Sequence, residues 1–126
     1  MSGETPEFGT IGWHDLTVDD ASGLRDFYAR VVGWEFSGLD MGGYEDYVMT
    51  APATGDGVAG VCHARGSNAG VPPQWISYVV VQDLEGAVAR AVEMGGACVN
   101  GPRGAGGGRM AIIRDPAGAV LGLYQP

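Results

Sequence analysis

Residues 16–33 read LTVDDASGLRDFYARVVG, and residues 79–96 read VVVQDLEGAVARAVEMGG. The second stretch repeats the pattern of the first at an offset of 63 residues (79 minus 16): a Val-x-Asp motif, a helical apolar periodicity and a closing glycine. This offset is half the length of the 126-residue chain. A repeat of that length predicts two copies of one supersecondary unit within a single domain.

Composition places the chain among soluble globular proteins and excludes several partners. The apolar fraction is 45% and the net charge is −8, with seven scattered basic residues and no lysine. Nucleic acids and anionic membranes attract clustered basic side chains, so neither is expected as a partner. No stretch approaches the roughly 20 apolar residues of a membrane span, and residues 1–10 do not resemble a signal peptide. Cys62 and Cys98 are expected to be buried, reduced thiols, which together with these absences predicts a cytoplasmic protein.

Periodicity and turn residues divide each half of the chain into the same series of elements. The first unit is expected at 8–64 and the second at 74–126, joined by a Gly/Pro-rich linker at 65–73. Expected strands lie at 10–18, 34–37, 44–50, 58–64, 75–81, 97–100, 109–114 and 119–124, and expected helices lie at 21–32 and 84–94. Residues 101–108 (GPRGAGGG) are expected to form a flexible turn, of which residues 104–108 would be a mobile lip over a ligand cleft.

Each unit therefore has the order βαβββ. A four-stranded sheet with a helix on one face leaves its other face uncovered, and two such faces can curve around a shared space. We expect an α+β fold in which two tandem βαβββ units form a curved, eight-stranded mixed sheet around a cleft that admits a small molecule.

Several short motifs occur in order in both halves and resemble those of the vicinal oxygen chelate superfamily. That superfamily contains glyoxalases, extradiol dioxygenases, bleomycin-resistance proteins and fosfomycin-resistance enzymes. The motifs are Asp20 with Phe27-Tyr28 and Gly33-Trp34, Val81-x-Asp83 with Gly95-Gly96, and Asp115-Pro116-Ala117-Gly118. The resemblance implies the same βαβββ fold and a homodimer, and it leaves the chemistry open because one fold hosts many functions.

The resemblance also implies where a divalent metal would bind in metal-dependent members. The four corresponding positions in this chain hold Trp13, Gly60, Ile76 and Gly122. None of these side chains offers a nitrogen or oxygen lone pair of the kind that such metals require. We therefore expect no metal and no other cofactor. His14 is expected to be a hydrogen-bonded core residue beside the first helix, and His63 to be exposed.

Strand alternation predicts which side chains line the cleft. Asp15 is the candidate catalytic residue, since a carboxylate in an apolar cleft can act as a general acid or base. Its alternative is a structural carboxylate bonded to Arg109 or to a tyrosine hydroxyl. The two glycines among the candidates either enlarge the cleft or allow close packing of the sheet. The candidate ligand-binding residues are Trp13, Thr17, Tyr47, Gly60, Ile76, Tyr78 and Gly122.

Two functions from different classes fit these residues. The first is a metal-free protein that binds a small apolar or aromatic molecule, with Trp13 and Tyr78 available for stacking. The alternative is a lyase, isomerase or dioxygenase-like enzyme that uses Asp15 or a recruited divalent metal. A third hypothesis is a module that serves only as a dimer partner.

Overall fold

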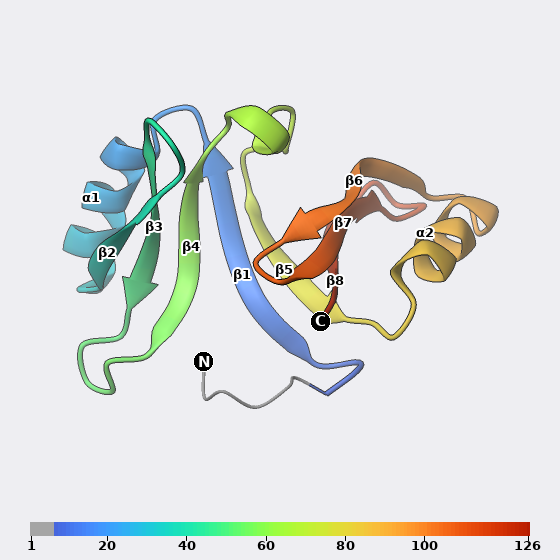
Figure 1. Ribbon diagram of the computed structural model, residues 1–126, viewed down its shortest axis with the longest axis horizontal. Coiled ribbons are helices and arrows are strands. Elements are labelled where there is room, and N and C mark those ends of the chain that lie inside the picture. The colour runs from blue at the N-terminus through green and yellow to red at the C-terminus, as the bar shows by residue number, and fades with distance from the viewer. Residues whose placement is uncertain (1–6) are drawn as a thin grey trace. The chain divides into compact units, whose positions relative to one another are not determined.

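The computed structural model describes residues 7–126. Within this range the chain forms eight strands, two α-helices and one short 3-10 helix (Figure 1). The strands are β1 (Ile11–Val18), β2 (Glu35–Asp40), β3 (Glu45–Thr50), β4 (Gly57–His63), β5 (Trp75–Val80), β6 (Ala97–Ala105), β7 (Gly108–Arg114) and β8 (Val120–Gln125). The helices are α1 (Ala21–Val32), α2 (Leu84–Glu93) and the 3-10 helix η1 (Gly66–Asn68).

The chain divides into two compact units. The first comprises His14–Trp75, and the second comprises Ile76–Pro126 with the described residues up to Trp13. In the first unit the strand order is β2-β3-β4-β1, and in the second it is β5-β8-β7-β6. The β1/β4 and β5/β8 pairs are parallel, whereas the remaining pairs within each unit are antiparallel. The predicted α+β class, with two βαβββ units and mixed strand pairing, is confirmed.

The two helices begin in the same way because the sequence repeat includes their caps. The Asp20 carboxylate accepts a hydrogen bond from the Gly23 N–H at 3.0 Å, and the Asp83 carboxylate accepts one from the Gly86 N–H at 3.2 Å. Each aspartate thereby satisfies an N–H that the first helical turn leaves without a partner. Gly33 ends α1 in the left-handed conformation, with φ of 78°.

Each unit has a core between its helix and one face of its sheet. In the first unit Ala21 of α1 is buried with Tyr47, Met49, Ala59 and Val61. In the second unit Leu84 of α2 is buried with Ala111 and Leu123. These residues alternate along their strands, as they must when only one face packs on the helix.

Aromatic side chains cluster on the outer side of the first unit. The Trp75 indole N–H donates to the Tyr28 hydroxyl at 3.1 Å, and the ring of Trp34 lies edge-on to that of Trp75 with 6.0 Å between centroids. Edge-to-face contacts of this kind stabilise aromatic pairs beyond the area that they bury. The Phe27 ring contacts Tyr28 and remains 54% exposed.

The prediction of a flexible turn at residues 101–108 is wrong for most of these residues. Strand β6 continues to Ala105 and pairs with β7, with register shifts at Asn100 and Arg103. Gly101 permits one of these irregularities, since its φ is 81° and a side chain there would lie 2.6 Å from the Met110 carbonyl oxygen. Glycine therefore marks a bulge here rather than a loop. Likewise, β2 extends to Asp40, beyond the strand expected at 34–37.

Two further expectations concern burial and membranes. Cys98 is exposed and Cys62 is half-buried, so the expectation that both thiols are buried is wrong for Cys98. Neither cysteine forms a disulfide within the described residues. No helix in the described part of the chain is long and apolar enough to cross a membrane.

Candidate functional site

In the first unit, three predicted site residues share the face of the sheet opposite α1. Parallel pairing sets Asp15 beside Gly60 and Thr17 beside Cys62, while the alternating partner Val61 packs in the core with α1. Because neighbouring residues of a strand point to opposite faces, Asp15 and Thr17 point away from the helix. Asp15 is half-buried and Thr17 is buried. The bare backbone of Gly60 leaves Asp15 without a side chain beside it on that strand.

In the second unit, Tyr78 and Gly122 form a matched pair on the face opposite α2. Pairing of β5 with β8 sets these two residues side by side. The Tyr78 ring lies directly over Gly122, and any Cβ at position 122 would collide with ring carbons Cδ1 and Cε1. Gly122 therefore makes room for an aromatic ring. Of the two alternatives for this glycine, close packing is the one that the structure supports. Ile76, two residues before Tyr78, is 1% exposed.

The residues near the start of β1 differ in exposure. Trp13 is half-buried. His14 is exposed, and the expectation that it is a core histidine is wrong. Strand alternation predicted its direction, but burial depends on whether the neighbouring segment reaches that far along the strand.

Tyr47 lies on a different face from Asp15. It pairs with Val61, is 7% exposed and belongs to the core under α1. Its hydroxyl lies 2.9 Å from the Ser22 hydroxyl at the start of α1. The structure thus separates Tyr47 from the other predicted ligand-binding residues of the first unit, because β3 presents this position to the helix.

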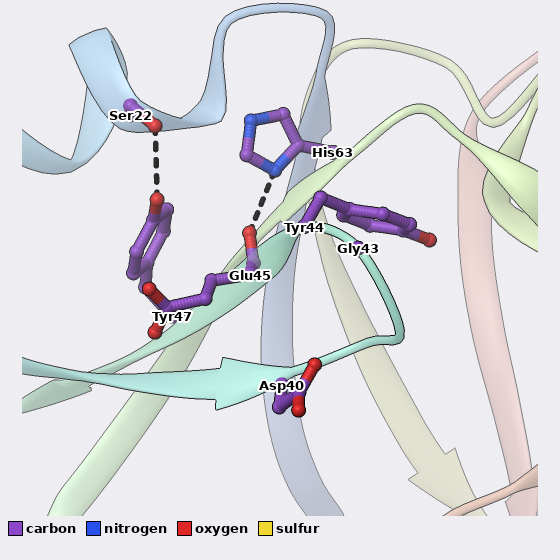
Figure 2. Close-up of a pocket in the computed structure, with 7 residues that line it drawn as sticks. All are labelled: Ser22, Asp40, Gly43, Tyr44, Glu45, Tyr47 and His63. Atoms are coloured by element: carbon purple, nitrogen blue, oxygen red, sulfur yellow. Dashed lines mark hydrogen bonds between the residues drawn. The ribbon is translucent and has the colours of Figure 1, made fainter.

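A pocket of about 630 Å³ opens beside this tyrosine, entirely within the first unit (Figure 2). The start of α1, the end of β2, the β2–β3 turn, β3 and the end of β4 contribute its walls. The lining residues are Ser22, Asp40, Gly43, Tyr44, Glu45, Tyr47 and His63.

His63 is the most firmly held polar group of the pocket. Its Nδ1 lies 2.8 Å from the Glu45 carbonyl oxygen and 3.5 Å from the Asp46 carboxylate. The same carboxylate accepts a hydrogen bond from the backbone N–H of His63 at 2.8 Å. The His63 side chain is only 16% exposed, so the expectation of an exposed histidine is wrong.

Asp46 is a buried carboxylate that sequence reasoning did not single out. Its exposed fraction is 3%, and burial of a carboxylate requires compensating hydrogen bonds. The only available signal was its place on the predicted strand at 44–50, where it alternates with Tyr47 and Met49. That alternation predicts that the Asp46 side chain points to the opposite face of the sheet from Tyr47 and Met49, but it gives no reason to expect a buried carboxylate there.

Two arginines border the pocket by stacking on its tyrosines. The Arg25 guanidinium carbon lies 4.6 Å from the Tyr47 ring centroid, and that of Arg65 lies 4.2 Å from the Tyr44 ring centroid. Stacking of this kind is favourable because the faces of aromatic rings are electronegative. A hydrogen bond to Asp26 raises the pKa of Arg25 above its ordinary value. Both arginines are thereby committed to neighbours within the first unit.

The residues at the metal positions implied by the resemblance do not fit a metal. Trp13, Gly60, Ile76 and Gly122 provide no donor side chain, and the Tyr78 ring fills the space over Gly122. Elsewhere in residues 7–126, no three His, Cys, Asp or Glu side chains gather in a way that could hold a metal ion.

Comparison with known proteins identifies the class. The profile of the glyoxalase/bleomycin resistance protein/dioxygenase superfamily matches residues 10–123, and the chain belongs to this superfamily. The predicted family resemblance is therefore confirmed.

Among curated proteins, the chain is 34% identical over 119 residues to CFP32 of Mycobacterium tuberculosis, whose name carries a provisional glyoxylase label. It is 33% identical over 120 residues to the anthracycline biosynthesis protein DnrV of Streptomyces peucetius. Each match covers 93% of this chain, but only 46% of CFP32 and 42% of DnrV. The chain thus spans less than half the length of these relatives.

Solved structures show the same fold at low identity. A variant of methylmalonyl-CoA epimerase from Streptomyces coelicolor, bound to 2-nitronate-propionyl-CoA, superposes with a TM-score of 0.60 and 14% identity, covering 94% of this chain and 98% of that chain. A superfamily member from Vibrio splendidus 12B01 superposes with a TM-score of 0.58 and 16% identity, covering 93% and 100% of the two chains. At these identities the likeness establishes the fold alone.

Proposed function

We propose that this chain binds a small apolar or aromatic molecule without a metal. The observation that carries the proposal is the Tyr78 ring packed over Gly122, on the face of the second unit opposite α2. An aromatic ring occupies the place where metal-dependent relatives are expected to present a ligand side chain. The Tyr78 ring thus provides a surface for apolar contact where a metal-binding side chain would otherwise lie.

The kind of ligand is supported by one relative and by one half-buried aromatic residue. DnrV is named as an anthracycline biosynthesis protein, and anthracyclines contain fused planar rings. Trp13 is half-buried and can stack on such a ring system. We therefore favour a planar aromatic ligand over an aliphatic one.

Titration with a planar probe tests this proposal. Binding of a hydroxyanthraquinone, followed by calorimetry and tryptophan fluorescence, should be unchanged by a chelator. Trp13→Leu should weaken binding about two- to tenfold, as expected for loss of one aromatic contact. Trp34→Leu is the matched control, because Trp34 packs beside Tyr28 on the side of α1 and should leave the affinity unchanged. Equal losses in the two variants would contradict the proposal.

A second candidate function is an enzyme in which Asp15 transfers a proton. The supporting observation is that Asp15, a half-buried carboxylate, lies beside Gly60 on the face opposite α1. Turnover of any substrate that is found should be lost in Asp15→Asn while binding and thermal stability are kept. Full activity of that variant would exclude Asp15 as the acid or base.

Assembly and location belong to the same proposal. We propose a homodimer in the cytoplasm, on the basis of the family resemblance and of two cysteines that form no disulfide within the described residues. Light scattering of the purified protein measures the oligomeric state, and a monomer at all concentrations would contradict the first part.

A further inference from the structure

The pocket of the first unit shown in Figure 2 plays no part in the proposed function, and its chemistry is different. We propose that it is a second binding site that takes a small protonated amine. The hydrogen-bonding groups of five lining residues, Ser22, Asp40, Glu45, Tyr47 and His63, support this assignment.

His63 lines the pocket with an imidazole ring whose orientation is fixed at Nδ1. Its Nδ1 contacts the Glu45 carbonyl oxygen at 2.8 Å, and the Asp46 carboxylate is 3.5 Å away. Both neighbours only accept hydrogen bonds, so Nδ1 is a ring nitrogen that carries a proton, and in the corresponding neutral tautomer Nε2 is an acceptor. Figure 2 shows Nε2 on the opposite side of the ring from the Glu45 contact, facing the side where Ser22 lies.

The other polar groups of the lining add acceptors and negative charge. The carboxylates of Asp40 and Glu45 accept hydrogen bonds and cannot donate them. The hydroxyls of Ser22 and Tyr47 share one hydrogen bond at 2.9 Å and retain acceptor capacity. No lysine or arginine is among the lining residues. Arg25 and Arg65 border the pocket, and Arg25 is engaged by Asp26 while both guanidinium groups stack on tyrosine rings.

A ligand that satisfies this lining must supply donors and positive charge. A primary ammonium group has three N–H donors and no acceptor, which complements the carboxylates and hydroxyls of the lining and the neutral tautomer of His63. An anion would be repelled by Asp40 and Glu45. A neutral polyol would find hydrogen bonds but would gain nothing from the two charges. A volume of about 630 Å³ accommodates a short aliphatic diamine.

The test uses 1,4-diaminobutane as the probe and the full chain as the protein. The chain has two histidines, so its imidazole protons give two sets of NMR signals, which His63→Gln assigns. The diamine should shift the His63 signals and leave those of His14 in place. The neutral isostere 1,4-butanediol should shift neither set. Added salt should weaken the effect, because charge attraction at an exposed site is screened.

Charge variants locate the site. Asp40→Asn and Glu45→Gln should each raise the Kd for the diamine about two- to fivefold, as expected for one partly exposed ionic contact. Asp56→Asn is the matched control, since Asp56 is an exposed carboxylate of the same unit outside the pocket and should leave the Kd unchanged. The proposal is overturned if butanediol shifts His63 as strongly as the diamine, if the diamine leaves His63 unshifted, or if Asp56→Asn weakens binding as much as the pocket variants.

Discussion

At some positions in this protein the neighbouring side chains limit which residue can fit, and Gly122 is the clearest case. A Cβ at this position would collide with the Tyr78 ring. Gly122 and Tyr78 lie on the paired strands β8 and β5. Gly122→Ala should therefore lower the free energy of unfolding by about 1–3 kcal/mol, the usual cost of overpacking. Urea denaturation measures this loss.

Two further variants make this prediction specific. In a Tyr78→Ala background, Gly122→Ala should cost less, because the ring that it strikes is gone. Gly104→Ala is the control, since nothing lies within 4 Å of a Cβ at that strand position. If the losses in the two backgrounds are equal, the contact with Tyr78 is not the cause.

Asp46 is a second residue whose role depends on its surroundings. Its carboxylate accepts the His63 backbone N–H at 2.8 Å while only 3% of the residue is exposed. Asp46→Ala leaves that N–H without its acceptor and should cost about 1–3 kcal/mol of stability. Chemical denaturation is the measurement, and Asp46→Asn, which keeps an acceptor oxygen, should cost less. An alanine variant as stable as the parent would show that water or another acceptor takes its place.

Among secondary-structure elements, the two helices depend on equivalent caps. Asp20 and Asp83 occupy matching places in the sequence repeat, and each carboxylate accepts a hydrogen bond within the first helical turn. Asp20→Ala and Asp83→Ala should each lower the free energy of unfolding by about 0.5–2 kcal/mol, as loss of an N-cap does. Thermal and urea unfolding followed by circular dichroism test this.

The neighbouring Asp19 is the control for the first helix. It is exposed and is not the N-cap of α1, so Asp19→Ala should change stability by less than about 0.5 kcal/mol. A loss as large as that of Asp20→Ala would point to the general charge near the helix rather than to the cap.

At the scale of the whole molecule, the absence of donor side chains at the implied metal positions predicts independence from metals. Prolonged dialysis against a chelator should leave the Tm unchanged, because removal of a tightly bound ligand lowers stability and here none is expected. Elemental analysis of the purified protein provides the independent measurement. A stoichiometric amount of zinc, nickel, manganese or iron would contradict this prediction.

The sequence by itself determined the order of elements, both helices and the βαβββ repeat. Cap aspartates, apolar periodicity and closing glycines act over a few residues, so these features can be read locally. The ranges of α1 and most strands agree with expectation, and the exceptions lie where glycine was taken for a turn. At Gly101 it instead permits a bulge within β6.

Only the tertiary structure decided what each side chain meets. Alternation along β1 predicted that Asp15 and Thr17 point away from α1, but not that His14 is exposed or that Tyr47 packs under the helix. The pairing of β3 with β4 brings Asp46 to His63, 17 residues apart, and the pairing of β5 with β8 lays Tyr78 over Gly122. Such contacts depend on strand register between distant segments, and no local pattern in the chain encodes which residues that register brings together.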